Sequence, residues 1–389
     1  YLLPNSHPSL KVRVKQALDA IKLVYASTYS PIARGYIQAV NYKMDEEKMA
    51  VVIQEVVGNQ FDHYFYPHIS GVAQSYNYYP FSHMKPDEGF AVAALGLGKY
   101  VVEGEKAYRF APKYPDIDIN SPKDQYKNSQ DEFFAVDLNK KELNLLEGDT
   151  AGLTRLALDD AEMQGTINHL ASVYDHENNT ISPGIDKPGP RVINFANIFK
   201  YNYIPLAKTI EVVMDVVKEA MGSPVEIEFA VDLKKDSRNR ATFYLLQIKP
   251  LIGSALDFNV VVDKIPKEKI WLYTEKGMGN GSIQDIRDVI YVDRKKFNKV
   301  DTVTMAQEIE KLNEKFIEEG GKYILIGPGR WGTRDKFIGI PVNWPQISCA
   351  GVIIETSLED FPLDASSGSH FFHNVVSMNV GYLTVQPEL

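Results

Sequence analysis

The chain has 389 residues, of which 44% are hydrophobic and 24% are charged, a composition typical of folded globular proteins. At roughly 100–200 residues per domain, this length predicts two or three separate cores. The 42 basic and 51 acidic residues leave a formal charge of −9, which argues against nucleic acid or an anionic membrane as a partner. No stretch of ~18 apolar residues predicts a membrane span. The single cysteine, Cys349, favours a reducing compartment, and we expect a cytoplasmic protein.

The first residues carry no recognisable targeting signal. The chain starts at Tyr1 without an initiator methionine, a basic segment or a cleavage site after an apolar stretch. We therefore expect it to be a piece of a longer polypeptide.

The first 252 residues are expected to contain helices and strands in mixed order. Helical spacing of apolar residues and capping signals predict helices at Leu10–Tyr25, from Ser30 to about Val40, at Leu153–Leu170 and at Ala207–Met221. Runs rich in β-branched residues predict strands at Met49–Val57, Ser70–Tyr76 and Phe90–Leu95, and a hairpin of Val225–Leu233 with Ala241–Leu251.

The character of the chain changes near residues 255–268, where we place a domain boundary. Beyond it we expect a helix at Thr304–Glu319 and strands at Val289–Val292, Tyr323–Ile326, Gly351–Glu355 and Gly381–Val385. The sequence thus predicts a mixed α/β (α+β) protein with a larger domain at 1–260 and a smaller α/β module at 261–389.

The hairpin is the part of the sequence that could hold a metal and a phosphate. Side chains alternate along a strand, so Glu226, Glu228 and Asp232 share one face. On the second strand Leu245, Gln247 and Lys249 are expected to share a face. If Glu228 pairs with Gln247, a carboxylate, an amide oxygen and an ammonium lie together, which suits Mg²⁺ and a phosphoryl group. The alternative is a half-solvated hairpin whose polar face meets only water.

Five segments in the same order resemble the nucleotide-binding domain of phosphoenolpyruvate synthase and pyruvate phosphate dikinase, an ATP-grasp fold. They cover roughly residues 20–252. The segments are Val24-Tyr25-Ala26-Ser27 with Ala33 and Tyr36, the run Met49–Val57, Ser70-Gly71-Val72-Ala73, Gly96-Leu97-Gly98 with Val101-Val102-Glu103-Gly104, and the hairpin Val225–Leu251.

The resemblance implies roles for six residues. Glu228 and Gln247 fall on the family's metal ligands, and Lys249 falls on an arginine that faces the terminal phosphate. The backbone around Gln54, Glu55 and Val57 falls on the hinge that reads adenine. ATP and Mg²⁺ are the implied cofactors, and phosphoryl transfer is the implied reaction, with pyruvate as the acceptor suggested by the family.

Three departures from the family's pattern limit what is carried over. The early phosphate-binding lysine and arginine of the family lie upstream of the matched segment, so the ATP-grasp domain is expected to be incomplete at its N-terminal side and inactive alone. Lys249 replaces an arginine and cannot form a bidentate fork. After the hairpin the sequence also lacks the length for a (β/α)₈ barrel, and it has no clear phosphohistidine motif.

Three hypotheses follow from these observations. The first is an ATP- and Mg²⁺-dependent phosphotransferase related to phosphoenolpyruvate synthase, acting on a small molecule. The second is a non-catalytic module that binds ATP for regulation, and the third is a scaffold with a dead site. The sequence leaves the oligomeric state open.

Two further segments have competing interpretations. The loop Gly327–Gly332 follows a predicted strand, but it lacks the lysine of a P-loop and contains Pro328, so it is either an anion site with Arg330 or a structural turn. The segment Ser366–His373 resembles a phosphohistidine loop at His370, and the alternative is a turn.

Overall fold

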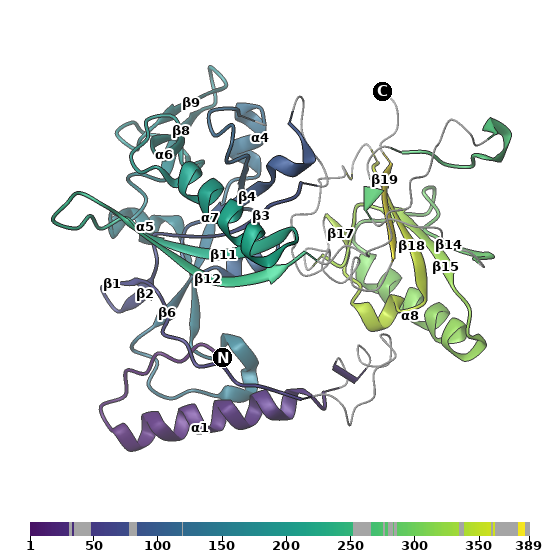
Figure 1. Ribbon diagram of the computed structural model, residues 1–389, viewed down its shortest axis with the longest axis horizontal. Helices are drawn as coiled ribbons and strands as arrows, with labels where there is room; N and C mark the ends of the chain where they lie inside the picture. Colours follow the sequence, from purple (N-terminus) through teal and green to yellow (C-terminus); the bar gives the residue numbers. More distant parts are fainter. Residues whose placement is uncertain are drawn as a thin grey trace. The chain divides into compact units, whose positions relative to one another are not determined.

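The computed structural model describes residues 1–30, 33–34, 48–77, 84–118, 120–251, 266–274, 277–278, 283, 286–333, 338–358, 361 and 380–385. The chain divides into two units, one of residues 1–28 and 49–251 and the other of residues 29–48 and 252–389. Helices and strands are mixed in both units, which confirms the predicted α/β class (Figure 1). Among the described residues, no helix is long and apolar enough to cross a membrane.

The main sheet of the first unit has five strands in the order β12-β11-β3-β4-β5, and all neighbours are antiparallel. The strands are β12 (Thr242–Pro250), β11 (Val225–Asp232), β3 (Ile69–Gln74), β4 (Phe90–Ala94) and β5 (Tyr108–Phe110). Every residue of β3 and β4 is buried, so the middle of the sheet is covered on both faces. The strands predicted near Ser70–Tyr76 and Phe90–Leu95, and the predicted hairpin, are confirmed.

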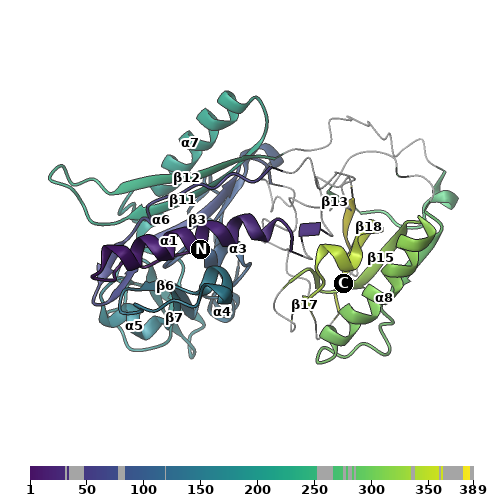
Figure 2. The same ribbon diagram turned by 90° about the horizontal axis from the view of Figure 1, so that it is seen from below.

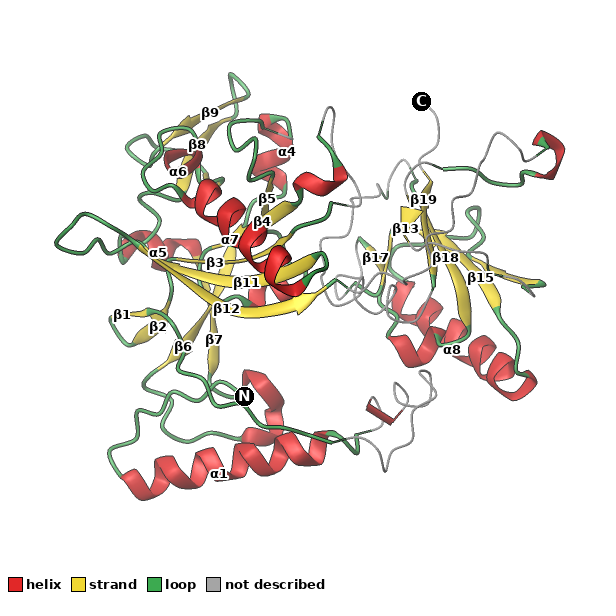
Figure 3. Ribbon diagram, in the orientation of Figure 1, coloured by secondary structure: helices red, strands yellow, loops and turns green. Residues whose placement is uncertain are grey.

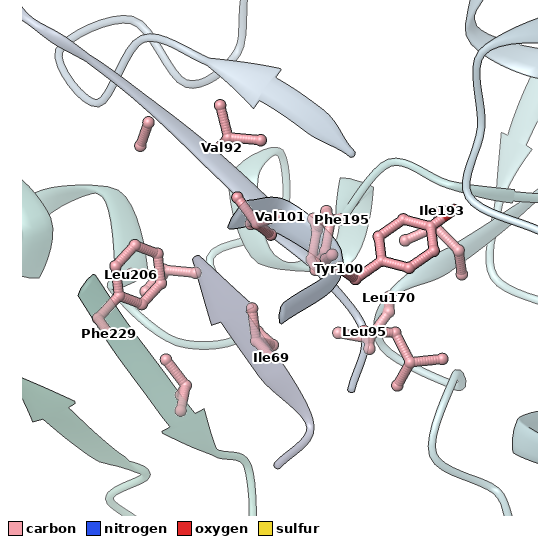
Figure 4. Packing of buried hydrophobic residues seen from close by; sticks show 14 of the residues in the cluster. Ile69, Val92, Leu95, Tyr100, Val101, Leu170, Ile193, Phe195, Leu206 and Phe229 are labelled. Atoms are coloured by element: carbon pink, nitrogen blue, oxygen red, sulfur yellow. The ribbon is translucent and has the colours of Figure 1, made fainter. Parts of the chain in front are cut away.

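Helix α7 (Leu206–Met221) packs on one face of this sheet (Figure 1). Its buried side chains recur at helical spacing and include Ile210, Met214 and Val217. Leu206 of α7 and Phe229 of β11 belong to the same buried cluster (Figure 4). Gly222 ends the helix in the left-handed conformation, which glycine adopts at little cost. The helix predicted at Ala207–Met221 is confirmed.

Two smaller sheets complete the first unit. One has the order β1-β2-β6-β7 and the other the order β10-β8-β9. Their strands are β1 (Asn59–Phe61), β2 (Tyr64–Tyr66), β6 (Glu132–Asp137), β7 (Leu153–Ala157), β8 (Ala171–Asp175), β9 (Thr180–Pro183) and β10 (Arg191–Ile193), and the short helices are α3 (Lys99–Val102), α4 (Pro122–Lys127), α5 (Leu158–Met163) and α6 (Ala196–Phe199).

The prediction of one helix over Leu153–Leu170 is right only in its middle third, because turns follow Met163. Residues 153–157 form strand β7, which pairs with β6, and only Leu158–Met163 are helical. The apolar spacing of Leu153 and Leu156 suits both a short strand and a helix, and the partner strand decides between them.

Helix α1 (Leu10–Ser27) confirms the first predicted helix, but its apolar stripe is exposed. Leu10, Val14, Leu18 and Tyr25 are each about half exposed or more, and the helix packs instead through Ala20. Figure 2 shows the helix along its full length. The helix predicted from Ser30 lies mostly outside the described residues.

The second unit contains a five-stranded sheet in the order β13-β19-β18-β15-β14, in which the last four strands are parallel. Helix α8 (Thr302–Glu319) lies beside it (Figure 3). The predicted helix and strands of this part of the chain are confirmed. The strands are β13 (Gly277–Met278), β14 (Asp288–Tyr291), β15 (Tyr323–Pro328), β18 (Ala350–Thr356) and β19 (Gly381–Val385), with a small pair, β16 (Arg330–Trp331) and β17 (Gly339–Ile340).

A buried glutamate fixes the loop that follows β15. Glu355 of β18 accepts a hydrogen bond from the Trp331 backbone N–H at 2.9 Å, and both residues are almost fully buried. Burial raises the pKa of Glu355 to about 7, although the Tyr382 hydroxyl, the Trp331 N–H and the charge of Arg330 oppose this shift. The folded unit therefore holds a proton here that the unfolded chain releases near its ordinary pKa of 4.5.

The second unit becomes less stable as the pH rises, because Glu355 loses this proton. The pKa is higher in the folded state, so the contribution of this proton to the free energy of unfolding is complete below about pH 4.5. The contribution is lost between about pH 4.5 and pH 7, and it amounts to roughly 3 kcal/mol. Glu355→Gln does not release this proton, so its free energy of unfolding should not fall over this range. Relative to wild type, we expect the variant to be about 3 kcal/mol more stable at pH 8 than it is at pH 4.5. All three tryptophans, Trp271, Trp331 and Trp344, belong to this unit, so urea unfolding followed by tryptophan fluorescence reports on it.

Exposed Glu319 provides the control, since Glu319→Gln should leave the pH dependence of unfolding unchanged. If the difference between wild type and Glu355→Gln is the same at both pH values, Glu355 is not the titrating group.

Candidate functional site

The hairpin of β11 and β12 presents its acidic residues on the face of the sheet opposite helix α7. Ile227 and Phe229 of β11 are buried in the cluster that includes α7. Because side chains alternate along a strand, Glu226 and Glu228 project from the other face. The first requirement of the predicted site, a shared face for these carboxylates, is met.

The register of the hairpin brings the predicted residues together. Glu228 lies directly opposite Gln247, and Glu226 lies directly opposite Lys249. Directly opposed residues of an antiparallel pair point to the same face, with Cβ atoms about 5 Å apart. Glu228 is partly buried and Gln247 is exposed, so both can reach a ligand in solvent.

A β-bulge corrects one expectation about this face. The register shifts between Glu228 and Phe229, so that Phe229 pairs with Leu245 and Leu246 is the extra residue. Leu245 therefore lies on the Phe229 side of the hairpin, and the prediction that it shares a face with Gln247 and Lys249 is wrong.

Lys249 is held between two carboxylates. Its Nζ atom donates to Glu228 Oε1 at 2.6 Å and lies 3.6 Å from Glu226 Oε1. The Lys249 and Glu228 side chains are 22% and 24% exposed, so this ion pair is partly shielded from water.

Glu226 is the buried member of the cluster, at 4% exposure. Its Oε2 atom accepts a hydrogen bond of 2.7 Å from Nε2 of Gln74, which is equally buried on the neighbouring strand β3. The sequence placed Glu226 on this face but gave no role to Gln74. Only the strand order reveals the contact, because β3 is about 150 residues away along the chain.

The predicted adenine hinge is not a strand. Within the described residues no ladder includes Met49–Val57, so that strand prediction is wrong. A β-branched run has the propensity for a strand, but a strand forms only against a partner. Gln54 donates from Nε2 to the Leu246 carbonyl at 3.3 Å, so the hinge touches β12 at its bulge. Glu55 is exposed and Val57 is half-buried.

The oxygen donors of the hairpin fit a hard cation that takes its other ligands from elsewhere. Glu228 offers a carboxylate and Gln247 an amide oxygen, and Mg²⁺ commonly uses one or two protein ligands together with phosphate and water. In the described part of the chain no three His, Cys, Asp or Glu side chains gather into a metal cluster. The carboxylate of Glu228 also holds Lys249, so a cation at this place requires the ammonium to move.

The two other segments singled out in the sequence contribute little to this site. Gly327 lies near the end of strand β15 and Gly329 directly after it, and an added Cβ at these positions would meet the rings of Trp331 and Phe361 at 2.4 and 2.2 Å, respectively. Arg330 is buried beside them, which supports the structural interpretation of the loop. The segment Ser366–His373 lies outside the described residues.

Comparison with known proteins yields one match. No curated protein and no solved structure matches the chain. The family model of the pyruvate phosphate dikinase AMP/ATP-binding domain matches residues 9–267, which is more than half of the sequence and includes the whole hairpin. The chain therefore belongs to the family of the pyruvate phosphate dikinase AMP/ATP-binding domain.

Proposed function

We propose that the protein is an ATP- and Mg²⁺-dependent phosphotransferase of the pyruvate dikinase type, related to phosphoenolpyruvate synthase. The observation that carries the proposal is the direct pairing of Glu228 with Gln247 on the open face of the hairpin, with Lys249 beside them. The family membership supports ATP as the ligand. We infer an ATP-grasp arrangement and a cytoplasmic location from the sequence.

Each residue has a distinct chemical task in this proposal. Glu228 and Gln247 hold the divalent cation, which when bound neutralises phosphate charge. Lys249 places its ammonium against the phosphate that is transferred, where developing negative charge is stabilised. The backbone around Gln54, Glu55 and Val57 binds adenine at the edge of the sheet. Pyruvate is the acceptor that we infer from the family.

A regulatory module that binds ATP without turnover is the second candidate. It is favoured by the ion pair between Lys249 and Glu228, because the proposed metal ligand and the proposed phosphate-binding group contact each other directly. A lysine also cannot form the bidentate hydrogen bonds that an arginine makes to a phosphate.

Isotope exchange between ATP and AMP in the full-length protein separates the two candidates. We expect exchange that requires Mg²⁺, and we expect pyruvate to be consumed when it is added. Binding of ATP in calorimetry without any exchange would favour the regulatory module. Absence of both binding and exchange would reject the proposal.

A further inference from the structure

The second carboxylate of the hairpin has no task in the proposed reaction, although it is the more firmly held of the two. Glu226 is nearly inaccessible and is fixed by the hydrogen bond from Gln74, whereas Glu228 is about a quarter exposed. Lys249 lies opposite Glu226 in the register but makes its short contact diagonally to Glu228. The ammonium therefore has two negative partners within 4 Å, one rigid and one accessible.

We propose that Glu226 is a positioning residue that takes over Lys249 when Glu228 turns to a divalent cation. This inference rests on the proposed function, since it assumes that Glu228 is a metal ligand. Lys249 moves from Glu228 Oε1 to Glu226 Oε1, from which its Nζ already lies 3.6 Å away. A change of side-chain torsions is enough, and the backbone pairing of the hairpin stays as it is.

Charge decides the direction of this exchange. A divalent cation on Glu228 repels the ammonium next to it, so the short ion pair with Glu228 is lost. Glu226 cannot follow a departing lysine into solvent, because it is buried and tied to Gln74. A buried carboxylate without a cation is costly, so Glu226 retains Lys249 at the hairpin. Lys249 then stays close to where a phosphate would bind.

Gln74 determines which oxygen of Glu226 receives the lysine. Its Nε2 atom donates to Oε2, and the other oxygen, Oε1, is the one nearer to Lys249. The Gln74 amide thus orients the Glu226 carboxylate so that one oxygen faces β3 and the other faces β12. This three-strand chain of Gln74, Glu226 and Lys249 follows directly from the register, in which Glu226 has both residues as direct neighbours.

A double-mutant cycle on Mn²⁺ affinity tests the exchange. Mn²⁺ alone serves as the probe, its binding to the full-length protein is followed by water proton relaxation, and nucleotide and turnover are not needed. We expect Glu226→Gln to weaken Mn²⁺ binding at least about fivefold more when Lys249 is present than in the Lys249→Met background. Without its second carboxylate, Lys249 stays on Glu228 and competes with the cation.

Equal effects of Glu226→Gln in both backgrounds would overturn the exchange, because a simple field effect of the lost charge does not depend on Lys249. Glu226→Asp keeps the charge, so it should keep Mn²⁺ affinity within about threefold of wild type. If Glu226→Gln does not fold, a loss of affinity in Glu226→Asp as large as about tenfold overturns the proposal by itself.

The matched control is Lys113→Met, which breaks a similar lysine–glutamate pair with Glu88 elsewhere in the first unit and should leave Mn²⁺ binding unchanged. Different results reject the exchange and the metal site. Mn²⁺ binding with additive mutant effects rejects the exchange and leaves the proposed function intact. No Mn²⁺ binding by the wild type rejects the metal site, and the exchange with it.

Discussion

Replacing Glu228 with alanine is expected to reduce Mg²⁺-dependent exchange between ATP and AMP by at least about 100- to 1,000-fold in the full-length protein. Glu228 supplies the only charged oxygen of the proposed pair with Gln247, so its loss leaves a neutral amide to hold a divalent cation. Lys249 loses its 2.6 Å partner but retains Glu226 at 3.6 Å. Binding of metal-free ATP should therefore change much less than exchange does.

Two comparisons make this experiment decisive. Glu228→Gln keeps the shape of the side chain and should show the same loss, which separates charge from packing. Glu142→Ala removes an exposed carboxylate from a loop of the same unit and should keep wild-type exchange. Wild-type exchange in Glu228→Ala would reject the metal assignment.

Gly71→Ala is expected to cost about 3 kcal/mol of the stability of the first unit, the upper range for overpacking a core. Gly71 lies in the middle of buried strand β3, directly opposite Phe229. An added Cβ would come within 2.4 Å of both the Phe229 ring and the Val92 carbonyl oxygen. The ring could turn aside, but the carbonyl belongs to the backbone of β4, so the sheet itself must shift.

Gly98→Ala is the matched control for this substitution. Its added Cβ would meet Ser70 at an ordinary distance of 3.6 Å, so its effect should stay within about 0.5 kcal/mol. Urea unfolding followed by far-ultraviolet circular dichroism should show a destabilised transition in Gly71→Ala, while the tryptophan signal of the second unit stays unchanged. Equal stability of the two alanine variants would show that the sheet accommodates the methyl group.

Glu228 and Gly71 lie in paired strands of the same sheet, and the packing of its two faces is connected. Strand β11 carries Glu226 and Glu228 on one face and Phe229 on the other. On the neighbouring strand β3, Gln74 lies opposite Glu226 and Gly71 lies opposite Phe229. The close approach that Gly71 permits brings β3 into the register that places Gln74 against Glu226. The packing of one face thereby fixes the polar geometry of the other.

Local pattern was sufficient for the elements whose partners are close along the chain. Helix α7 follows from its apolar spacing and from Gly222, and both signals lie within the helix itself. The hairpin of β11 and β12 follows from two alternating strands joined by a short polar loop, but the sequence offered the pairing of Glu228 with Gln247 only as a condition, which the register meets.

Local pattern failed where pairing with another strand decides the conformation. The run Met49–Val57 has the composition of a strand, yet the described sheets offer it no ladder, and Leu153–Ala157 became a strand because β6 lies next to it. The bulge that turns Leu245 to the other face is likewise invisible in an alternating sequence.

By itself, the sequence determined the family, the hairpin and the chemical types of the residues that we propose for the site, since these depend on residue identity and on spacing along one segment. The tertiary structure alone decided that Gln74 meets Glu226 and that Lys249 lies between two carboxylates. The contact between Gln74 and Glu226 joins segments about 150 residues apart, and strand pairing over such a separation is selected by the packing of the whole sheet, which no local pattern encodes.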